Sequence, residues 1–269
     1  MAEVALDKVG KVFESRSGRV NALSAVDLRV ARNEFVAIVG ASGCGKSTLL
    51  NLVAGFEHPT GGTVRVDGKL VERPGPDRGV VFQQSALFPW LTVRRNIAFG
   101  LGLAANRSRT LKGPSVDQIL KRVGLAAFAN HFPAQLSGGM RQRAAIAGVL
   151  VIDPGVLLMD EPFGALDALT RSLMQDFLLE LWEENRKTVL LVTHDINEAV
   201  YLADRLVIMA GHPGRVREIV PVDLPRPRRY ALQAEPEFIR LRDHVTRIVR
   251  DEAAKAAATE AAGVESAAA

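Results

Sequence analysis

The chain contains a single cysteine, Cys44, among its 269 residues. One cysteine cannot form an intrachain disulfide, and it cannot supply a cysteine cage for a structural metal ion. Small secreted scaffolds that are held together by disulfides are therefore excluded. The cysteine content is compatible with a protein of the reducing cytosol.

Long hydrophobic runs are also missing from the sequence. The longest apolar stretch, residues 144–159, is interrupted by Asp153 and Pro154. A membrane-spanning helix needs about 20 apolar residues, and the N-terminus has no apolar run of the length found in a signal peptide. We therefore expect the chain to reach a membrane only through a partner or through its surface.

The excess of basic over acidic residues is small. The chain has 34 lysines and arginines against 30 aspartates and glutamates, which gives a net charge of +4, and 48% of its residues are hydrophobic. This composition is typical of a globular protein and excludes a largely disordered chain or a collagen. A charge of this size is weak support for a nucleic-acid partner, and we expect none.

The spacing of apolar residues changes along the chain. Short apolar runs before residue 40, a hairpin over 63–71 and a strand at 80–82 come first. Helical spacing dominates from residue 85 to about 150. Strands return at 156–159 and 188–193 on either side of a helical segment, which predicts parallel βαβ units.

The C-terminal third continues with strands at 205–210 and 215–222, a proline-interrupted linker and a last amphipathic helix. We interpret the arginines of the linker and of this helix as a solvated face, and binding to acidic lipid headgroups or to a partner is the alternative. Residues 253–269 are mostly alanine, and we expect a disordered tail there, with a frayed helix as the alternative.

A glycine-rich loop, GASGCGKST, occupies residues 40–48. It matches the pattern G-x-x-x-x-G-K-[ST] through Gly40, Gly45, Lys46 and Ser47, and it lies between an apolar strand and a helix. Such a loop wraps a polyphosphate with inward-facing N–H groups at a helix N-terminus. Lys46 would balance phosphate charge and Ser47 would bind Mg²⁺. A glycine turn without a ligand is the alternative.

Two adjacent carboxylates, Asp160 and Glu161, follow the apolar run at 156–159. Ligands of open α/β sheets bind at the carboxyl ends of the strands, so this pair would lie near the glycine-rich loop. We expect Asp160 to hold Mg²⁺ and Glu161 to polarise the attacking water. A solvated strand end is the alternative, which the phosphate loop makes the weaker interpretation.

A second candidate anion site has the sequence LSGGMRQR, residues 136–143. Ser137, Gly138 and Gly139 open a basic helical run, and the N-terminus of a helix attracts anions. A helix cap formed by Ser137 explains part of the pattern. A cap does not explain why a basic run follows Ser137, or why the segment lies between the glycine-rich loop and the Asp160–Glu161 pair.

Together these motifs resemble those of the ATP-binding subunits of ABC transporters, over residues 4–252. GASGCGKST resembles the Walker A loop, LSGGMRQR the ABC signature, and VLLMDEP (156–162) Walker B. The resemblance implies an α/β P-loop NTPase with a RecA-like core, an antiparallel β-subdomain and a helical subdomain at approximately 85–150. It also implies an ATP hydrolase that uses Mg²⁺ with ATP and acts as a dimer.

The resemblance assigns roles to single residues as well. Contacts to ATP are implied for Phe13, stacked on adenine, and for Gly40, Ala41, Ser42, Gly43, Cys44, Gly45, Lys46, Ser47 and Thr48. The implied catalytic residues are Glu161, His194 and Gln83, and the implied metal ligands are Ser47, Gln83 and Asp160. Ser137, Gly138, Gly139 and Gln142 would contact the ATP of the partner subunit, Asp167 would cross the dimer interface, and Phe88 and Trp90 would dock a permease.

The resemblance extends to one kind of transport system. Residues 75–101 and 212–228 are similar to those of the nitrate, sulfonate and taurine importers. This implies a separate transmembrane permease, a periplasmic solute-binding protein as an indirect partner, and a peripheral position on the cytoplasmic face of the inner membrane. An exporter subunit is one alternative. A DNA-maintenance ATPase is another, although such proteins insert long coiled coils where this chain has no sustained heptads.

Overall fold

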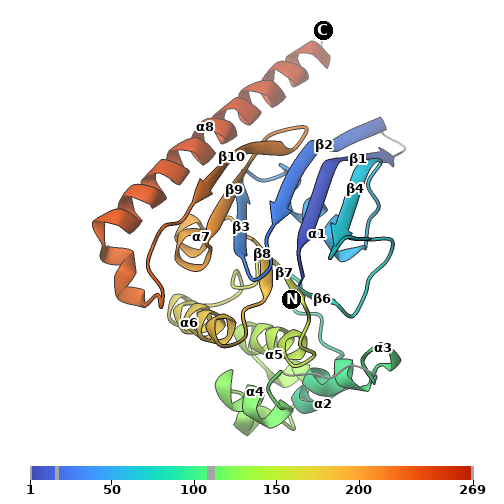
Figure 1. Ribbon diagram of the computed structural model, residues 1–269, viewed down its shortest axis with the longest axis vertical. Helices are drawn as coiled ribbons and strands as arrows, with labels where there is room; N and C mark the ends of the chain where they lie inside the picture. Colours follow the sequence, from blue (N-terminus) through green and yellow to red (C-terminus); the bar gives the residue numbers. More distant parts are fainter. Residues whose placement is uncertain (1, 16–17, 108–112, 268–269) are drawn as a thin grey trace.

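The structure is a computed structural model that describes residues 2–15, 18–107 and 113–267. Two β-sheets lie at its centre, with helices around them (Figure 1).

The smaller sheet is antiparallel, with the strand order β2-β1-β4-β5. Its strands are β1 (Val4–Ser15), β2 (Gly18–Val30), β4 (Gly61–Val66) and β5 (Lys69–Leu70). β4 and β5 form the predicted hairpin, in which Asp67 and Gly68 at the turn have φ angles of 50° and 74°. A two-residue turn with positive φ at both positions favours this residue pair, which explains why the sequence signal was clear.

The larger sheet has the strand order β10-β9-β3-β8-β7-β6. Its strands are β3 (Phe35–Gly40), β6 (Arg78–Val81), β7 (Val156–Asp160), β8 (Thr188–Val192), β9 (Arg205–Ala210) and β10 (Arg215–Pro221). The first five of these are parallel, and β10 runs antiparallel to β9. The carboxyl ends of the parallel strands therefore lie at one edge of the sheet, where the residues that follow them meet.

Two hydrophobic cores cover the faces of the larger sheet. Val36 and Ile38 of β3 pack in one core with helix α1 (Lys46–Ala54), which lies between the two sheets. Phe35 and Val39 point to the opposite face and join the core of α6 (Ala168–Asn185) and α7 (Ile196–Leu202). Because β3 is buried on both faces, it is a continuous apolar run rather than an alternating one.

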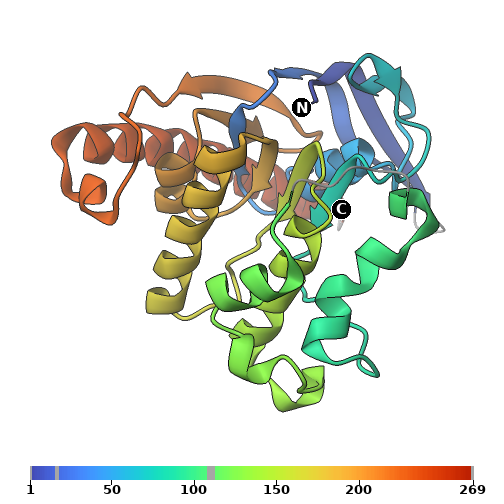
Figure 2. The same ribbon diagram turned by 60° about the horizontal axis from the view of Figure 1, so that its bottom comes forward.

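Shorter helices gather below the larger sheet (Figures 1 and 2). They are α2 (Val93–Ala98), η1 (Phe99–Gly102), α3 (Ala104–Arg107), α4 (Val116–Arg122), η2 (Ala126–Phe128), η3 (Pro133–Gln135) and α5 (Gly138–Leu150). α5 contacts both α2 and β6, so it joins this helical region to the sheet. Residues 108–112 of the expected helical segment lie outside the described residues. The parallel sheet, the antiparallel sheet and the helical region together agree with the predicted fold class.

The chain ends in η4 (Tyr230–Ala234) and the long helix α8 (Pro236–Ala267). α8 packs against α7 and β9 and then continues past the body of the molecule (Figure 1). The expectation of a disordered tail from residue 253 is therefore corrected up to Ala267, and residues 268–269 lie outside the described part. Alanine has the highest helix propensity, and extending an existing helix avoids the cost of nucleation. No helix among the described residues is long and apolar enough to cross a membrane.

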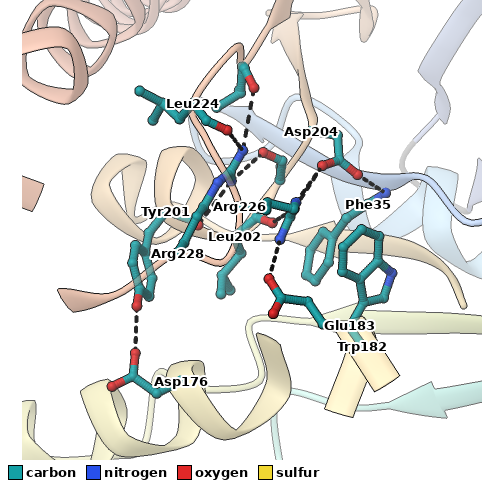
Figure 3. A network of polar contacts seen from close by, with 12 residues as sticks. Phe35, Asp176, Trp182, Glu183, Tyr201, Leu202, Asp204, Leu224, Arg226 and Arg228 are labelled. Atoms are coloured by element: carbon teal, nitrogen blue, oxygen red, sulfur yellow. Dashed lines mark hydrogen bonds and ion pairs between the residues drawn. The ribbon is translucent and has the colours of Figure 1, made fainter. Parts of the chain in front are cut away.

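Two linker arginines depart from the expected solvated face: Arg228 is buried and Arg226 half-buried, whereas Arg229 is exposed as expected (Figure 3). Arg228 is 6% exposed and donates hydrogen bonds to the carbonyl oxygens of Tyr201 and Ala203 at 3.0 and 2.7 Å. Arg226 lies 2.7 Å from Asp204 and stacks 4.2 Å from the ring of Trp182. Burial, followed by the charge of Arg226, lowers the pKa of Arg228 to about 10. These arginines therefore fasten the linker to the end of α7.

Candidate functional site

The glycine-rich loop connects the end of β3 to the first turn of α1. Gly45 has a φ angle of 89°, and a Cβ at this position would lie 2.6 Å from Leu23 Cδ2 and 2.9 Å from the carbonyl oxygen of Ala22. The left-handed backbone and the close neighbours both require glycine. The loop therefore brings bare backbone to the N-terminus of α1, which is the arrangement that binds phosphate groups.

Lys46 is held inside this loop. Its Nζ donates hydrogen bonds to the carbonyl oxygens of Gly40 at 2.9 Å and Ala41 at 2.8 Å. Cys44 is buried beside it, with Sγ 3.7 Å from the same Nζ. Burial raises the pKa of the Cys44 thiol, and the charge of Lys46 offsets only part of this effect. The ammonium group is therefore held at the loop by backbone carbonyls, whereas the buried thiol behaves as a small uncharged side chain.

Ser47 and Asp160 meet across the carboxyl ends of β3 and β7. The Ser47 hydroxyl donates a hydrogen bond of 3.1 Å to Asp160 Oδ1. Burial raises the pKa of Asp160, the Ser47 hydrogen bond lowers it, and the neighbouring charge of Glu161 raises it again. A hydroxyl and a crowded carboxylate are the oxygen ligands that Mg²⁺ prefers. These two residues therefore fit a magnesium ion.

Glu161, Gln83 and His194 form a hydrogen-bonded group at the same edge. Gln83 Nε2 donates to Glu161 Oε2 at 2.8 Å, and His194 Nδ1 lies 3.1 Å from Glu161 Oε1. Glu161 has a φ angle of 45°, which is rare for a residue with a side chain. Backbone strain of this kind clusters at functional sites. The three residues follow the ends of the neighbouring strands β7, β6 and β8, respectively.

One cavity of about 550 Å³ connects the phosphate loop to this group. Its volume is within the range of small-molecule sites. The lining residues come from the glycine-rich loop, from the ends of the parallel strands and from β2: Ala22, Ser42, Gly43, Gly45, Lys46, Ser47, Thr48, Gln83, Glu161 and His194. The structure thus brings together residues that the sequence separates by up to about 170 positions.

The candidate partner-facing residues lie outside this cavity. Ser137 caps α5 by accepting a hydrogen bond from the backbone N–H of Met140 at 3.2 Å. Asp167 caps α6 by accepting one from Thr170 at 3.0 Å, which lowers its pKa. Neither residue is among those that line the cavity. The two helix N-termini therefore remain available to a ligand or chain that approaches from outside.

Gln142 is buried within its own chain. It is 1% exposed, and its Nε2 donates a hydrogen bond of 3.0 Å to the carbonyl oxygen of Phe82. α5 turns the side chain inward, where it ties the helix to the segment just before Gln83. A contact of Gln142 with the partner's ATP stays a prediction.

Comparison with known proteins decides the family. The sequence profile of the ABC transporter family matches residues 23–164, which is more than half of the chain. The chain belongs to the ABC transporter family. It is an ATP-binding subunit that hydrolyses ATP, as the sequence motifs predicted.

Relatives of this ABC subunit cover most of its length. The nitrate import ATP-binding protein NrtD of Synechocystis sp. is 44% identical over 248 residues, which are 90% of this chain and 93% of that protein. The bicarbonate transport ATP-binding protein CmpD of Synechococcus elongatus is 46% identical over 242 residues, 89% of this chain and 87% of that protein. The dimeric ATP-binding cassette MJ0796 bound to ADP and Pi is 34% identical with a TM-score of 0.72, and the match covers 82% of this chain and all of that one. The predicted fold class is thereby confirmed.

Phe13 of the ABC subunit is not one of the described residues that line the cavity. The ammonium group of Lys11 lies 4.7 Å from the centre of its ring, so a cation is close to the aromatic group. Stacking of adenine on Phe13 stays a prediction.

Phe88 and Trp90 lie in a cluster of aromatic side chains. The ring of Phe88 is 5.5 Å from that of Trp90 and 4.4 Å from that of Phe99. Trp90 is 69% exposed, whereas Phe88 is half-buried. The two residues that were expected to dock a permease therefore differ in exposure: Phe88 lies within the cluster, and Trp90 is exposed to solvent.

Sequence analysis missed Glu198, which lies on α7 four residues after His194. It is 4% exposed and accepts a hydrogen bond from Gln175 of α6 at 3.2 Å. Its signal in the sequence was a lone acidic residue inside the apolar run of α7, a position where a charged side chain is costly unless it has a partner.

Proposed function

We propose that this chain is the ATP-hydrolysing subunit of a bacterial ABC importer. Two copies would bind Mg-ATP between them and drive a separate transmembrane permease. The observation that carries the proposal is that Lys46, Ser47 and the Gln83–Glu161–His194 group line one cavity, with Asp160 hydrogen-bonded to Ser47. This arrangement combines phosphate binding with a positioned carboxylate beside it.

Each group has a distinct task in this proposal. The loop backbone and Lys46 bind the phosphates of ATP, and Gly40 to Thr48 form the wall around them. Ser47, Asp160 and Gln83 hold Mg²⁺, which supplies charge neutralisation on the phosphates when bound. Glu161 orients and polarises the attacking water. His194 contacts the γ-phosphate from the opposite side.

A second copy completes the site. Ser137, Gly138 and Gly139 of the partner cover the γ-phosphate at the N-terminus of its α5, where the helix dipole favours an anion. Asp167 crosses the interface between the subunits. Support comes from the position of these residues outside the cavity of their own chain, and from the dimeric cassette with 34% identity. We expect a homodimer.

The exposed aromatic cluster is the proposed permease contact. Trp90 is an exposed large side chain close in sequence to Gln83, and tryptophan is enriched among interface anchors. Through the permease the subunit is held at the cytoplasmic face of the inner membrane, and a periplasmic solute-binding protein is an indirect partner.

The proposed solute is a small anion or zwitterion: nitrate, an aliphatic sulfonate or taurine. Similarity to the nitrate import protein NrtD favours nitrate, and similarity to the bicarbonate transport protein CmpD adds bicarbonate. An exporter subunit or a DNA-maintenance ATPase is the alternative, and nothing in the geometry of the site favours either.

The proposal is tested with the purified protein and with its permease. We expect Mg-dependent ATP hydrolysis that is lost with EDTA, and uptake of labelled nitrate, taurine or sulfonate by proteoliposomes that also hold the binding protein. Hydrolysis without any uptake of these solutes would overturn the solute assignment. Absence of hydrolysis in the assembled complex would overturn the assignment of the site.

A further inference from the structure

Glu198 is a buried acid on the helix that follows the histidine of the site. Its side chain is 4% exposed. Oε2 accepts the hydrogen bond from Gln175, while Oε1 is buried and has no hydrogen bond of good geometry among the described residues. A buried carboxylate with an unsatisfied oxygen is costly, because its desolvation is not repaid.

The surroundings of Glu198 link two parts of the site. Its backbone N–H donates to Asp195 Oδ1 at 3.2 Å, and Asp195 directly follows His194. Asp195 Oδ2 also lies 3.7 Å from Arg171 of α6, whose guanidinium donates to the carbonyl oxygen of Leu166 at 3.2 Å. Leu166 precedes Asp167, the candidate interface residue. Two polar contacts, Gln175–Glu198 and Arg171–Asp195, therefore join α6 to the first turn of α7.

We propose that Glu198 is a positioning residue for His194: its carboxyl group binds Gln175 and holds the first turn of α7, so that the imidazole faces Glu161. The proposal rests on the role of His194 in ATP hydrolysis given above. It adds a residue that touches neither ATP nor metal and acts only through the histidine.

The charges around Glu198 explain why the acid is neutral. Burial, followed by the negative charge of Asp195, raises its pKa to about 8, although Thr193, Gln175 and Arg171 offset part of the shift. Of the other elements packed against α7, β3 has only apolar residues and glycine, η4 has no charged residue, and α8 contributes Phe238 and Val245 to the core. Charged groups contact the far end of α7 instead: Arg228 donates to the carbonyl oxygens of Tyr201 and Ala203, and Asp176 of α6 accepts a hydrogen bond from the Tyr201 hydroxyl. An ionised Glu198 would repel Asp195 within the same turn and displace His194.

The first experiment compares the pH dependence of ATP hydrolysis in the wild type and in Glu198→Gln. The amide keeps the shape of the acid and cannot ionise. We expect the wild-type kcat to fall above a pH of about 8, and the variant to keep its rate into more alkaline solution, with KM for Mg-ATP unchanged. The same alkaline decline in both proteins would overturn the proposal.

A second variant removes the contact altogether. Glu198→Ala should lower kcat about 10-fold to 100-fold at neutral pH with little change in KM, because small displacements of a catalytic group cost rates of this order. Glu180→Gln on the exposed face of α6 is the matched control and should change neither constant. If a thermal melt shows that Glu198→Ala is unfolded, the pH dependence of hydrolysis in the wild type and in Glu198→Gln still tests the proposal. An unchanged kcat in folded Glu198→Ala would contradict the proposal.

A third readout does not depend on hydrolysis. The chain has five histidines, and His194→Ala assigns the ring signal of His194 in an NMR titration. We expect an inflection of this signal near pH 8 in the wild type, where Glu198 loses its proton, and the loss of this inflection in Glu198→Gln. Identical titrations would refute the link between Glu198 and His194. Failure of the proposed catalytic roles shows separately, as normal hydrolysis by Glu161→Gln.

Discussion

His194 Nδ1 lies 3.1 Å from Glu161 Oε1 in the structure. The two residues follow different strands, β8 and β7, that are neighbours in the larger sheet. Gln83, after β6, binds the other oxygen of the same carboxylate at 2.8 Å. Glu161 is thus held from both sides, which fixes the direction of the carboxylate that we propose as the general base.

Replacing Glu161 by glutamine should abolish turnover and preserve nucleotide binding. The amide keeps the shape and loses the base, and the loss of a positioned general base costs about 10²-fold to 10⁴-fold in rate. ATP binding is measured by calorimetry, hydrolysis by phosphate release and dimer formation by light scattering. We expect ATP-bound dimers to accumulate. Normal steady-state hydrolysis by the variant would remove Glu161 from the mechanism.

Lys46→Ala should weaken nucleotide binding as well as hydrolysis. The ammonium group is held at the loop by two backbone carbonyls, and it can exchange them for phosphate oxygens. A hydrogen bond to a charged group contributes about 1.5–3 kcal/mol, so the Kd for ATP should rise about 10-fold to 100-fold. Calorimetry with the wild type as the reference measures this change. An unchanged Kd would contradict the assignment of the glycine-rich loop.

Trp90→Ala should leave the isolated subunit folded and able to bind ATP, because the side chain is 69% exposed. Assembly with the permease should weaken by about 2 kcal/mol, as expected for a truncated interface anchor. Co-purification and a thermal melt measure the two properties. Tyr230→Ala, a second exposed aromatic at 62%, is the matched control and should assemble normally. A large drop of the melting temperature with intact assembly would make Trp90 a core residue.

Arg228→Met should destabilise the fold. Its guanidinium donates hydrogen bonds to the carbonyl oxygens of Tyr201 and Ala203. Without these hydrogen bonds the two buried carbonyl oxygens would be unpaired. We expect the free energy of unfolding to fall by about 3 kcal/mol, measured by urea denaturation. Arg240→Ala breaks an exposed pair with Glu237 and should cost less than about 1 kcal/mol. Equal stabilities of the two variants would show that the Arg228 contacts contribute nothing.

The stability of the wild type should depend on pH through Glu198. Its pKa rises from 4.5 to about 8 on folding, so between these values the folded state holds a proton that the unfolded chain has lost. The contribution of Glu198 to the free energy of unfolding is then fully present below pH 4.5 and decreases as the pH rises to about 8. Glu198→Gln should lack this decrease, as measured by melting temperatures at several pH values. Parallel curves for both proteins would show that Glu198 is not protonated in the fold.

The sequence alone determined the family and most of the nucleotide site. Gly45, Lys46 and Ser47 must follow one another because one loop wraps the phosphates, and Asp160 and Glu161 must follow an apolar strand to reach its end. These requirements are local in the chain, so they leave a pattern that can be recognised. The hairpin at Asp67 and Gly68 was predictable for the same reason, since its φ angles favour few residues.

Tertiary structure decided what depends on distant partners. Whether an arginine is solvated or buried is set by the carbonyls and carboxylates that surround it, and those of Arg228 come from α7, more than 20 residues away. Gln142 turned inward because Phe82 offers a carbonyl oxygen 60 residues earlier in the chain. Glu198 became a candidate only when α6 placed Gln175 against it. A buried polar group takes its role from its neighbours in space, and the order of residues along the chain does not list them.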